Sequence, residues 1–176
     1  YNAAVHSREQ NNLDILNDTL ETWETKATEL WQGPHTRSKI QNEIPWANVT
    51  KPINESKIAL VTTGGFYTSE QKAFETDGPE KLGDWSYRTI DIAIPTSNLN
   101  VSHIHYDTTG PKKDPNCVFP LDIFKELEED GIIGKIANTN YSFMGYIQKP
   151  DLLTETTAKE VAQNLKADNV LSLIHI

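Results

Sequence analysis

The run KIALVT, residues 57–62, is the sequence feature that most constrains the fold. A short, largely apolar and β-rich run is typical of a strand buried on both faces, as inner strands of a parallel sheet are. Thr63-Gly64-Gly65 follows directly. Paired glycines at a strand end let the backbone approach a ligand or adopt positive φ, so Gly64 and Gly65 are candidate substrate-binding residues. A phosphate-binding loop needs a longer glycine pattern, and a nucleotide site is therefore not expected.

The rest of the chain alternates between strand-like and helical patterns. Strands are expected at 84–90 (an edge strand), 99–105, 132–136 and 141–147, and helices at 120–130 and 151–168. Gly131 ends the first helix, Pro150 precedes the second, and Val170 would open a further strand. This order predicts an α/β fold, with a layered, mostly parallel sheet and flanking helices.

Residues 12–32 form a separate pattern near the N-terminus. Their apolar side chains are spaced alternately three and four residues apart, which predicts an amphipathic helix with one narrow apolar stripe. The stripe either packs on its own domain or docks onto a partner subunit, because the same spacing occurs in coiled coils. We therefore expect an N-terminal helix and linker over 1–40 and the main domain over 41–170.

Chemistry-bearing residues are concentrated between His103 and Asp122. These twenty residues hold two histidines, three aspartates and the only cysteine of the chain. If 99–105 is a strand, His103, His105 and Asp107 lie on one face about 7 Å apart. Two imidazoles and a carboxylate could bind zinc or iron, as in metallo-β-lactamase-like hydrolases, although Thr108 replaces the next histidine of that motif. Alternatively they bond turn backbone, or handle protons in a metal-free site, which makes all three candidate catalytic residues.

Cys117 precedes the helix expected at Pro120. A helix N-terminus stabilises a thiolate, so Cys117 is a fourth candidate catalytic residue. The alternative is a buried packing residue beside Val118.

Composition excludes several classes of partner. The formal net charge of −9 argues against broad nucleic-acid binding, because neutralising phosphates requires a basic face. No apolar run approaches the ~20 residues that span a bilayer, so no membrane partner is expected. A single cysteine favours a reducing compartment, and we expect a cytoplasmic protein.

Seven segments carry a resemblance to a known family: PWANVTKP (45–52), IALVTTGG (58–65), GDWSYR (83–88), SHIHYD (102–107), DPNCVFPLD (114–122), NYSFMGYIQ (140–148) and LKAD (165–168). Together they resemble the selenoprotein B family of the glycine, sarcosine, betaine and D-proline reductases. The resemblance implies reductive cleavage of a carbon–nitrogen bond in a small amine or amino acid. Within the cysteine segment, Asp114 and Asn116 are candidate substrate-binding residues.

The resemblance also implies what accompanies this chain. In the family a selenocysteine or cysteine attacks the α-carbon, and thiols then reduce the mixed selenide-sulfide. We expect no cofactor in this chain; the nucleophile is expected beyond Val170. The D-proline and glycine enzymes also use a partner subunit that carries a pyruvoyl group. The substrate amine is left open.

The last six residues, LSLIHI, match the translation of a transposase mosaic end used in sequencing libraries. We expect residues 171–176 to be a non-native tail, Val170 to be the last native residue, and the fragment to be inactive alone. Three hypotheses remain: a fragment of a reductase subunit, a metal-dependent hydrolase built on His103, His105 and Asp107, and a non-catalytic scaffold subunit.

Overall fold

The computed structural model describes residues 47–76 and 83–176. The helix predicted over residues 12–32 lies outside the described residues and stays a prediction, as does the segment 1–40. The described residues contain the segments that were predicted to form the sheet and its flanking helices.

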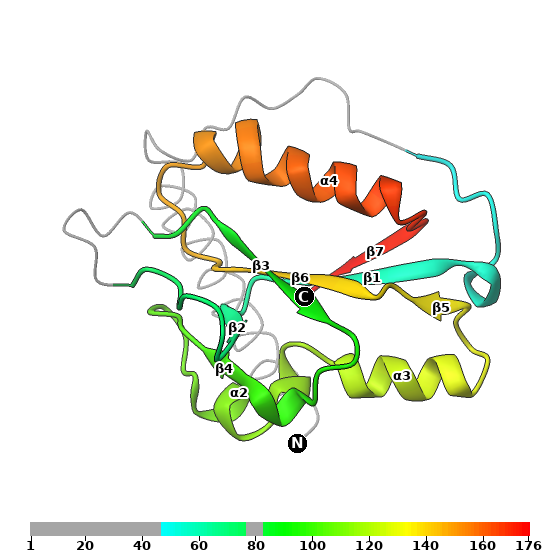
Figure 1. Ribbon diagram of the computed structural model, residues 1–176, viewed down its shortest axis with the longest axis horizontal. Coiled ribbons are helices and arrows are strands. Elements are labelled where there is room, and N and C mark those ends of the chain that lie inside the picture. The colour runs from blue at the N-terminus through cyan, green and yellow to red at the C-terminus, as the bar shows by residue number, and fades with distance from the viewer. Residues whose placement is uncertain (1–46, 77–82) are drawn as a thin grey trace, which may run out of the picture. The chain divides into compact units, whose positions relative to one another are not determined.

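The central strand of the main sheet is β1 (Lys57–Thr62), as the apolar run predicts. Three strands pair with it in parallel: β5 (Lys135–Ile136), β6 (Thr139–Phe143) and β7 (Ser172–His175). Ile58 pairs with both Ile136 and Ser172, which places β7 on the edge of β1 opposite β5. β5 and β6 follow one another along the same edge (Figure 1).

Antiparallel pairs complete the fold. β3 (Tyr87–Asp91) pairs antiparallel with β6 at the edge of the main sheet. A separate two-stranded sheet joins β2 (Phe66–Thr68) to β4 (Leu99–Val101). The predicted α/β class is therefore confirmed, and the sheets mix parallel with antiparallel pairs.

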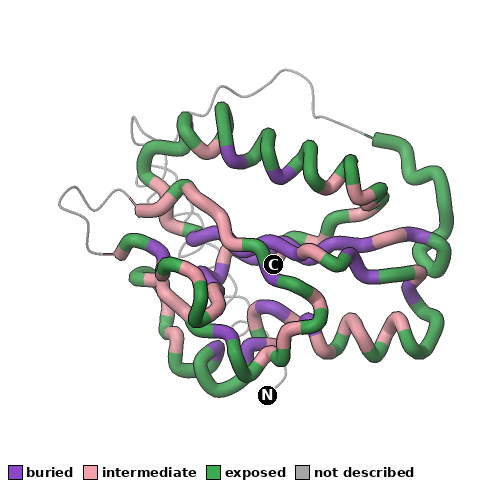
Figure 2. Tube along the Cα trace, in the orientation of Figure 1, coloured by how far each residue is buried: buried purple, intermediate pink, exposed green. Residues whose placement is uncertain are grey.

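The two longest described helices cover opposite faces of the main sheet (Figure 1). On one face α3 (Leu121–Glu129) packs Leu121 and Phe124 against a core that includes Leu60. On the other, α4 (Ala158–Ala167) packs Val161 and Leu165 against a core that includes Val61. Consecutive strand residues point to opposite faces, so one apolar run supplies both cores, and buried positions are concentrated along the sheet (Figure 2).

Short helical turns connect these elements: η1 (Ile53–Glu55), η2 (Thr96–Asn98), α2 (Thr109–Lys113), η3 (Pro115–Cys117) and a π-helical turn, η4 (Leu153–Thr157), that leads into α4. The helices predicted at 120–130 and 151–168 are both present. Within the described ranges, no helix has the length and apolar composition needed to cross a bilayer.

One predicted strand is wrong in extent. The strand expected over 99–105 ends at Val101, because the next backbone groups bond elsewhere: Ser102 N donates to Gly65 O, and His105 N donates to the side chain of His103. The expected strands at 132–136 and 141–147 are also shorter, as β5 and β6. Residues of the predicted non-native tail form β7, which pairs with β1. This pairing does not show where the tail comes from, and its non-native origin stays a prediction.

Candidate functional site

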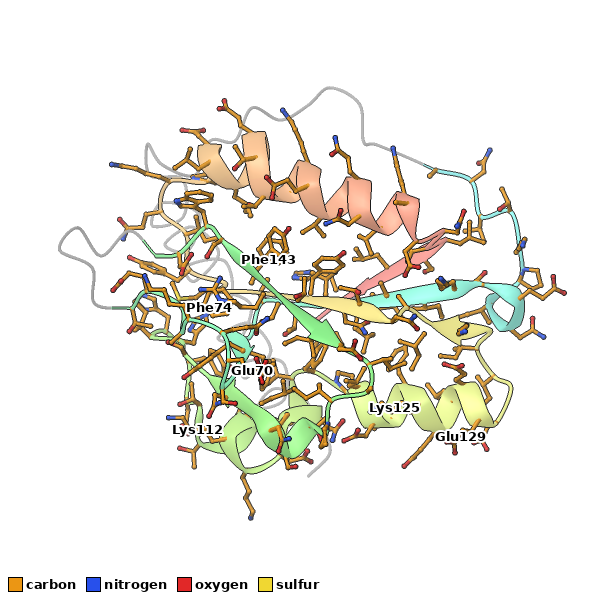
Figure 3. All side chains as sticks on the ribbon, in the orientation of Figure 1. Glu70, Phe74, Lys112, Lys125, Glu129 and Phe143 are labelled. Carbon is orange, nitrogen blue, oxygen red and sulfur yellow. The ribbon has the colours of Figure 1, made fainter. Side chains whose placement is uncertain are left out.

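The candidate site lies beyond the carboxyl ends of β1 and β6. These strands are parallel neighbours, and their connections leave in opposite directions. The chain after β1 buries Phe66 on the face covered by α3, whereas the chain after β6 leads to α4 on the other face. Phe143, at the end of β6, belongs to the α4-side core (Figure 3). In open α/β sheets, ligands bind where neighbouring connections diverge in this way.

Gly64 and Gly65 join three segments at this point. Gly65 N donates to Phe143 O at 2.9 Å, and Gly65 O accepts from Ser102 N at 2.9 Å. Gly64 N donates to Thr62 Oγ1 at 3.0 Å, and Gly64 O accepts from the Tyr106 hydroxyl at 2.7 Å. Both backbone N–H groups are thus bound by protein acceptors. Substrate binding by these glycines stays a prediction; what the geometry shows is that they hold the site together.

Gly65 also requires the absence of a side chain. Its φ is +75°, and a Cβ there would lie 2.3 Å from Ser102 O. A larger residue would therefore combine left-handed backbone strain with a direct clash against backbone. Position 65 is therefore restricted to glycine for a steric reason.

His103 is half-buried and held from two sides. Its Nδ1 accepts a hydrogen bond from His105 N at 3.1 Å, and its ring meets that of Tyr106 edge-on with 4.5 Å between centroids. Burial, and secondarily the charge of His105, lower the pKa of His103 below its ordinary value. The neutral imidazole is therefore favoured.

Cys117 is exposed in η3, so it is not a buried packing residue. Its thiol lies close enough to Tyr106 to influence that side chain: burial raises the pKa of the phenol, and the Cys117 charge raises it further. Tyr106 is thus a protonated hydroxyl donor beside both His103 and Cys117. Sequence reasoning passed over Tyr106, although it lies inside the SHIHYD segment.

The side chains of His105 and Asp107 make contacts with residues other than His103. The ring of exposed His105 lies against that of Tyr146, with 3.9 Å between centroids. Asp107 Oδ1 accepts from Thr109 N at 2.9 Å; hydrogen bonds from the Thr109 side chain and backbone lower the pKa of this carboxyl. The expectation that His103, His105 and Asp107 share one strand face is therefore wrong, because the strand ends before them. In residues 47–76 and 83–176, no group of three or more His, Cys, Asp or Glu could hold a metal ion.

Asp114 and Asn116 bond within their own segment. Asp114 Oδ1 accepts from Asn116 N at 3.0 Å. Asn116 Oδ1 accepts from Asp122 N at 3.1 Å, and its Nδ2 donates to Asp122 Oδ2 at 3.0 Å. These bonds fix η3 against the start of α3 and so position Cys117. A substrate-binding role for the two residues stays a prediction.

Comparisons with known proteins identify a family. A family profile described as "Glycine/sarcosine/betaine reductase selenoprotein B" matches residues 29–176. The chain is 34% identical over 125 residues to D-proline reductase subunit gamma of Acetoanaerobium sticklandii, covering 71% of this chain and 50% of the relative. It is 30% identical over 107 residues to sarcosine reductase complex component B subunit beta of Peptoclostridium acidaminophilum, covering 60% and 24%.

A third relative is glycine reductase complex component B subunit gamma of Symbiobacterium thermophilum, which is 28% identical over 134 residues, covering 76% of this chain and 31% of the relative. The chain thus spans half or less of the length of these relatives. No solved structure matches the chain significantly.

Proposed function

Because the chain belongs to the glycine/sarcosine/betaine reductase selenoprotein B family, we propose that it is part of a reductase-complex subunit that cleaves a carbon–nitrogen bond in a small amine. Relatives are named for D-proline, sarcosine, glycine and betaine, and one of these classes is the proposed substrate. The proposed location is the cytoplasm.

The observation that carries this proposal is the convergence of three segments at the ends of β1 and β6. Residues 62–65, 102–106 and 143–145 meet there through the hydrogen bonds of Gly64 and Gly65. Each of these segments lies in a stretch that resembles the reductase family. The convergence supports a site built around His103, His105 and Tyr106, with Cys117 near Tyr106.

The proposed chemistry needs groups from outside this chain. A selenolate or thiolate, placed beyond Val170 in the complete protein, forms a bond to the α-carbon as the carbon–nitrogen bond breaks. The amine leaves with the bonding electron pair and takes up a proton. A thiol then attacks the chalcogen, the α-carbon leaves and gains a proton, and a second thiol reduces the resulting selenide-sulfide or disulfide. A partner subunit, with a pyruvoyl group in some complexes, completes the proposed site.

His105 is the proposed proton donor to the leaving amine. Its ring is exposed beside Tyr146, next to Gly145 at the end of β6, and an imidazole exchanges protons near neutral pH. General acid assistance of this kind is worth about 10²–10⁴-fold. We therefore expect His105→Ala to lower turnover by about that factor without loss of fold.

The test uses the complete protein. The genomic reading frame downstream of Val170 is expressed with UGA read as selenocysteine, together with its partner subunits, and thiol-dependent amine release is measured with each of the four substrates. Lys135→Ala, exposed at the far end of the sheet, is the matched control for His105→Ala. Failure of the assembled complex to reduce any of the four would overturn the proposed function, and a loss under about threefold in His105→Ala would remove the proton-donor role.

A further inference from the structure

The hydrogen bonding of His103 fixes which of its nitrogens carries the proton. Nδ1 accepts from His105 N at 3.1 Å, so a neutral His103 carries its hydrogen on Nε2. Tyr106 contacts the ring edge-on with its hydroxyl turned to Gly64 O, which restricts ring rotation. The hydrogen bond from His105 N and the ring contact with Tyr106 therefore favour one tautomer and one ring orientation of His103.

The surroundings of His103 disfavour the imidazolium form. Protonation would place an N–H on Nδ1 facing the N–H of His105, which removes the hydrogen bond. The ionisable groups around the ring supply no compensating negative charge: His105 adds positive charge, Tyr106 stays protonated, and the Asp107 carboxylate bonds Thr109. The charge of Cys117 acts on the Tyr106 hydroxyl, whose pKa it raises, and is not among the influences on His103. A proton donor for the leaving amine is therefore better sought at His105.

Nε2 is presented where a small molecule can reach it. In the part of the chain that the structure describes, no protein acceptor bonds Nε2. Gly145 lies beside it, and a Cβ built on that glycine would be 3.4 Å from Nε2. Gly145 is exposed and lacks the side chain that would cover the imidazole.

We propose that His103 is a neutral hydrogen-bond donor that binds the substrate carboxylate through Nε2–H, and that Gly145 keeps this donor accessible. This inference rests on the proposed function. A donor can pair only with an acceptor, and the ammonium groups of the candidate substrates offer none. Their carboxylates do, and the carboxylate is the group that glycine, sarcosine, betaine and D-proline share. His103 thus recognises what is common to the class.

The kinetic test compares two replacements of His103 in the complete, partner-bound subunit. His103→Ala removes the donor, and a hydrogen bond to a charged group corresponds to about a 10- to 100-fold rise in KM. His103→Gln places a neutral amide donor near the position of Nε2, and we expect it to recover most of the rise in KM that His103→Ala causes. A large loss of kcat in both variants, with KM little changed, would overturn the proposal, because it would assign His103 a proton-transfer role that glutamine cannot perform.

A second variant tests access. Gly145→Ala puts a methyl group 3.4 Å from Nε2 on a backbone that is not in the left-handed region. We expect a rise in KM with little change in kcat. An unchanged KM would contradict the role of Gly145.

A spectroscopic readout separates this inference from the proposed function. In the complete subunit labelled with ¹⁵N-histidine, the His103 signals, assigned by their loss in His103→Gln, should report the Nε2–H tautomer at pH 7. They should shift on titration with acetate and not with methylammonium. A protonated ring, the other tautomer, or no response to acetate would each overturn the inference. If the complex reduces no amine while these signals behave as expected, the proposed function alone fails.

Discussion

Asn140 Oδ1 accepts a hydrogen bond from Leu60 N at 2.8 Å, at the point where β5 gives way to β6. The Asn140 amide also donates to Ala137 O at 3.1 Å. The backbone ladder is interrupted here, and the side chain of a fully buried asparagine replaces the missing backbone partner of β1. The hydrogen bonds along this edge of β1 therefore continue from β5 to β6, although the two neighbouring strands are separated by a break.

Asn140→Ala should be strongly destabilising. It leaves the Leu60 N–H and the Ala137 carbonyl buried without partners, and each unpaired group costs about 1–3 kcal/mol. We expect a loss of about 2–5 kcal/mol in the free energy of unfolding, measured by denaturant titration. Asn138→Ala, at an exposed position of the same turn, is the control and should change little. Equal effects of the two variants would contradict this account.

Substitutions at two glycines with positive φ, Gly131 and Gly65, distinguish the cost of backbone strain from the cost of a steric clash. Gly131 has φ +69° with nothing within 4 Å of a built Cβ, whereas Gly65 has φ +75° and a backbone oxygen 2.3 Å away. Gly131→Ala should therefore cost only the left-handed penalty of about 1–2 kcal/mol. Gly65→Ala should cost at least about 2 kcal/mol more, because backbone must move. Thermal or denaturant unfolding of both variants measures the difference, and similar losses would refute the clash at Gly65.

Asp84 should make stability dependent on acid pH. Burial, the largest influence, raises its pKa, but hydrogen bonds from Ser86 and Glu75 N and the charge of Arg88 together hold the pKa of this carboxyl below 3.8. The folded state therefore binds the proton more weakly than the unfolded state. The resulting stabilisation is present above about pH 4 and is lost as the pH falls through the folded pKa.

Asp84→Asn should lower the free energy of unfolding by about 1–3 kcal/mol at pH 7, and the difference from wild type should shrink below pH 3.8. Denaturant titrations at pH 7 and pH 3 measure this. The control is Asp130→Asn at an exposed position, which should change the free energy of unfolding by less than Asp84→Asn does at pH 7. A difference that stays constant with pH would show that the Asp84 charge is not responsible.

Cys117 should react with iodoacetamide in the native protein, because its side chain is exposed and is the only thiol in the chain. We expect labelling at a rate within a few-fold of that in the denatured chain, followed by mass spectrometry. In the active complex, Cys117→Ser should slow regeneration more than substrate binding if this thiol resolves the mixed selenide-sulfide. Labelling only after unfolding would contradict the exposure of Cys117 and its role as a resolving thiol.

The elements that were predicted correctly are those whose patterns are set by burial. The apolar run of β1 matches its predicted bounds, and α3 matches within a residue at each end because Leu121, Phe124 and Leu127 face the core. The strand expected at 99–105 fails for a local reason. His103 bonds the backbone of His105 and turns the chain, a contact that strand periodicity does not reveal.

The polar residues that organise the site were harder to predict. Asn140 and Ser142 are fully buried in β6 and accept from backbone N–H groups of other segments. In a sequence, such residues read as solvent-facing. Gly64, Gly65 and His103 were named as candidate site residues from the sequence, and their role in a site stays a prediction. Their contacts with Tyr106 and Gly145 join distant segments, which the sequence pattern does not reveal.

The Phe66 N–H and Ser142 Oγ are joined at 2.8 Å although they are 76 residues apart. Closing a loop of this length costs chain entropy before the contact contributes any stabilisation, so contacts between such distant residues form slowly during folding. During synthesis, His103 and Cys117 are added to the chain before β6 (Thr139–Phe143), which completes their surroundings. The candidate site residues therefore enter the chain before the strand that completes their surroundings, and the site takes shape only when the sheet closes.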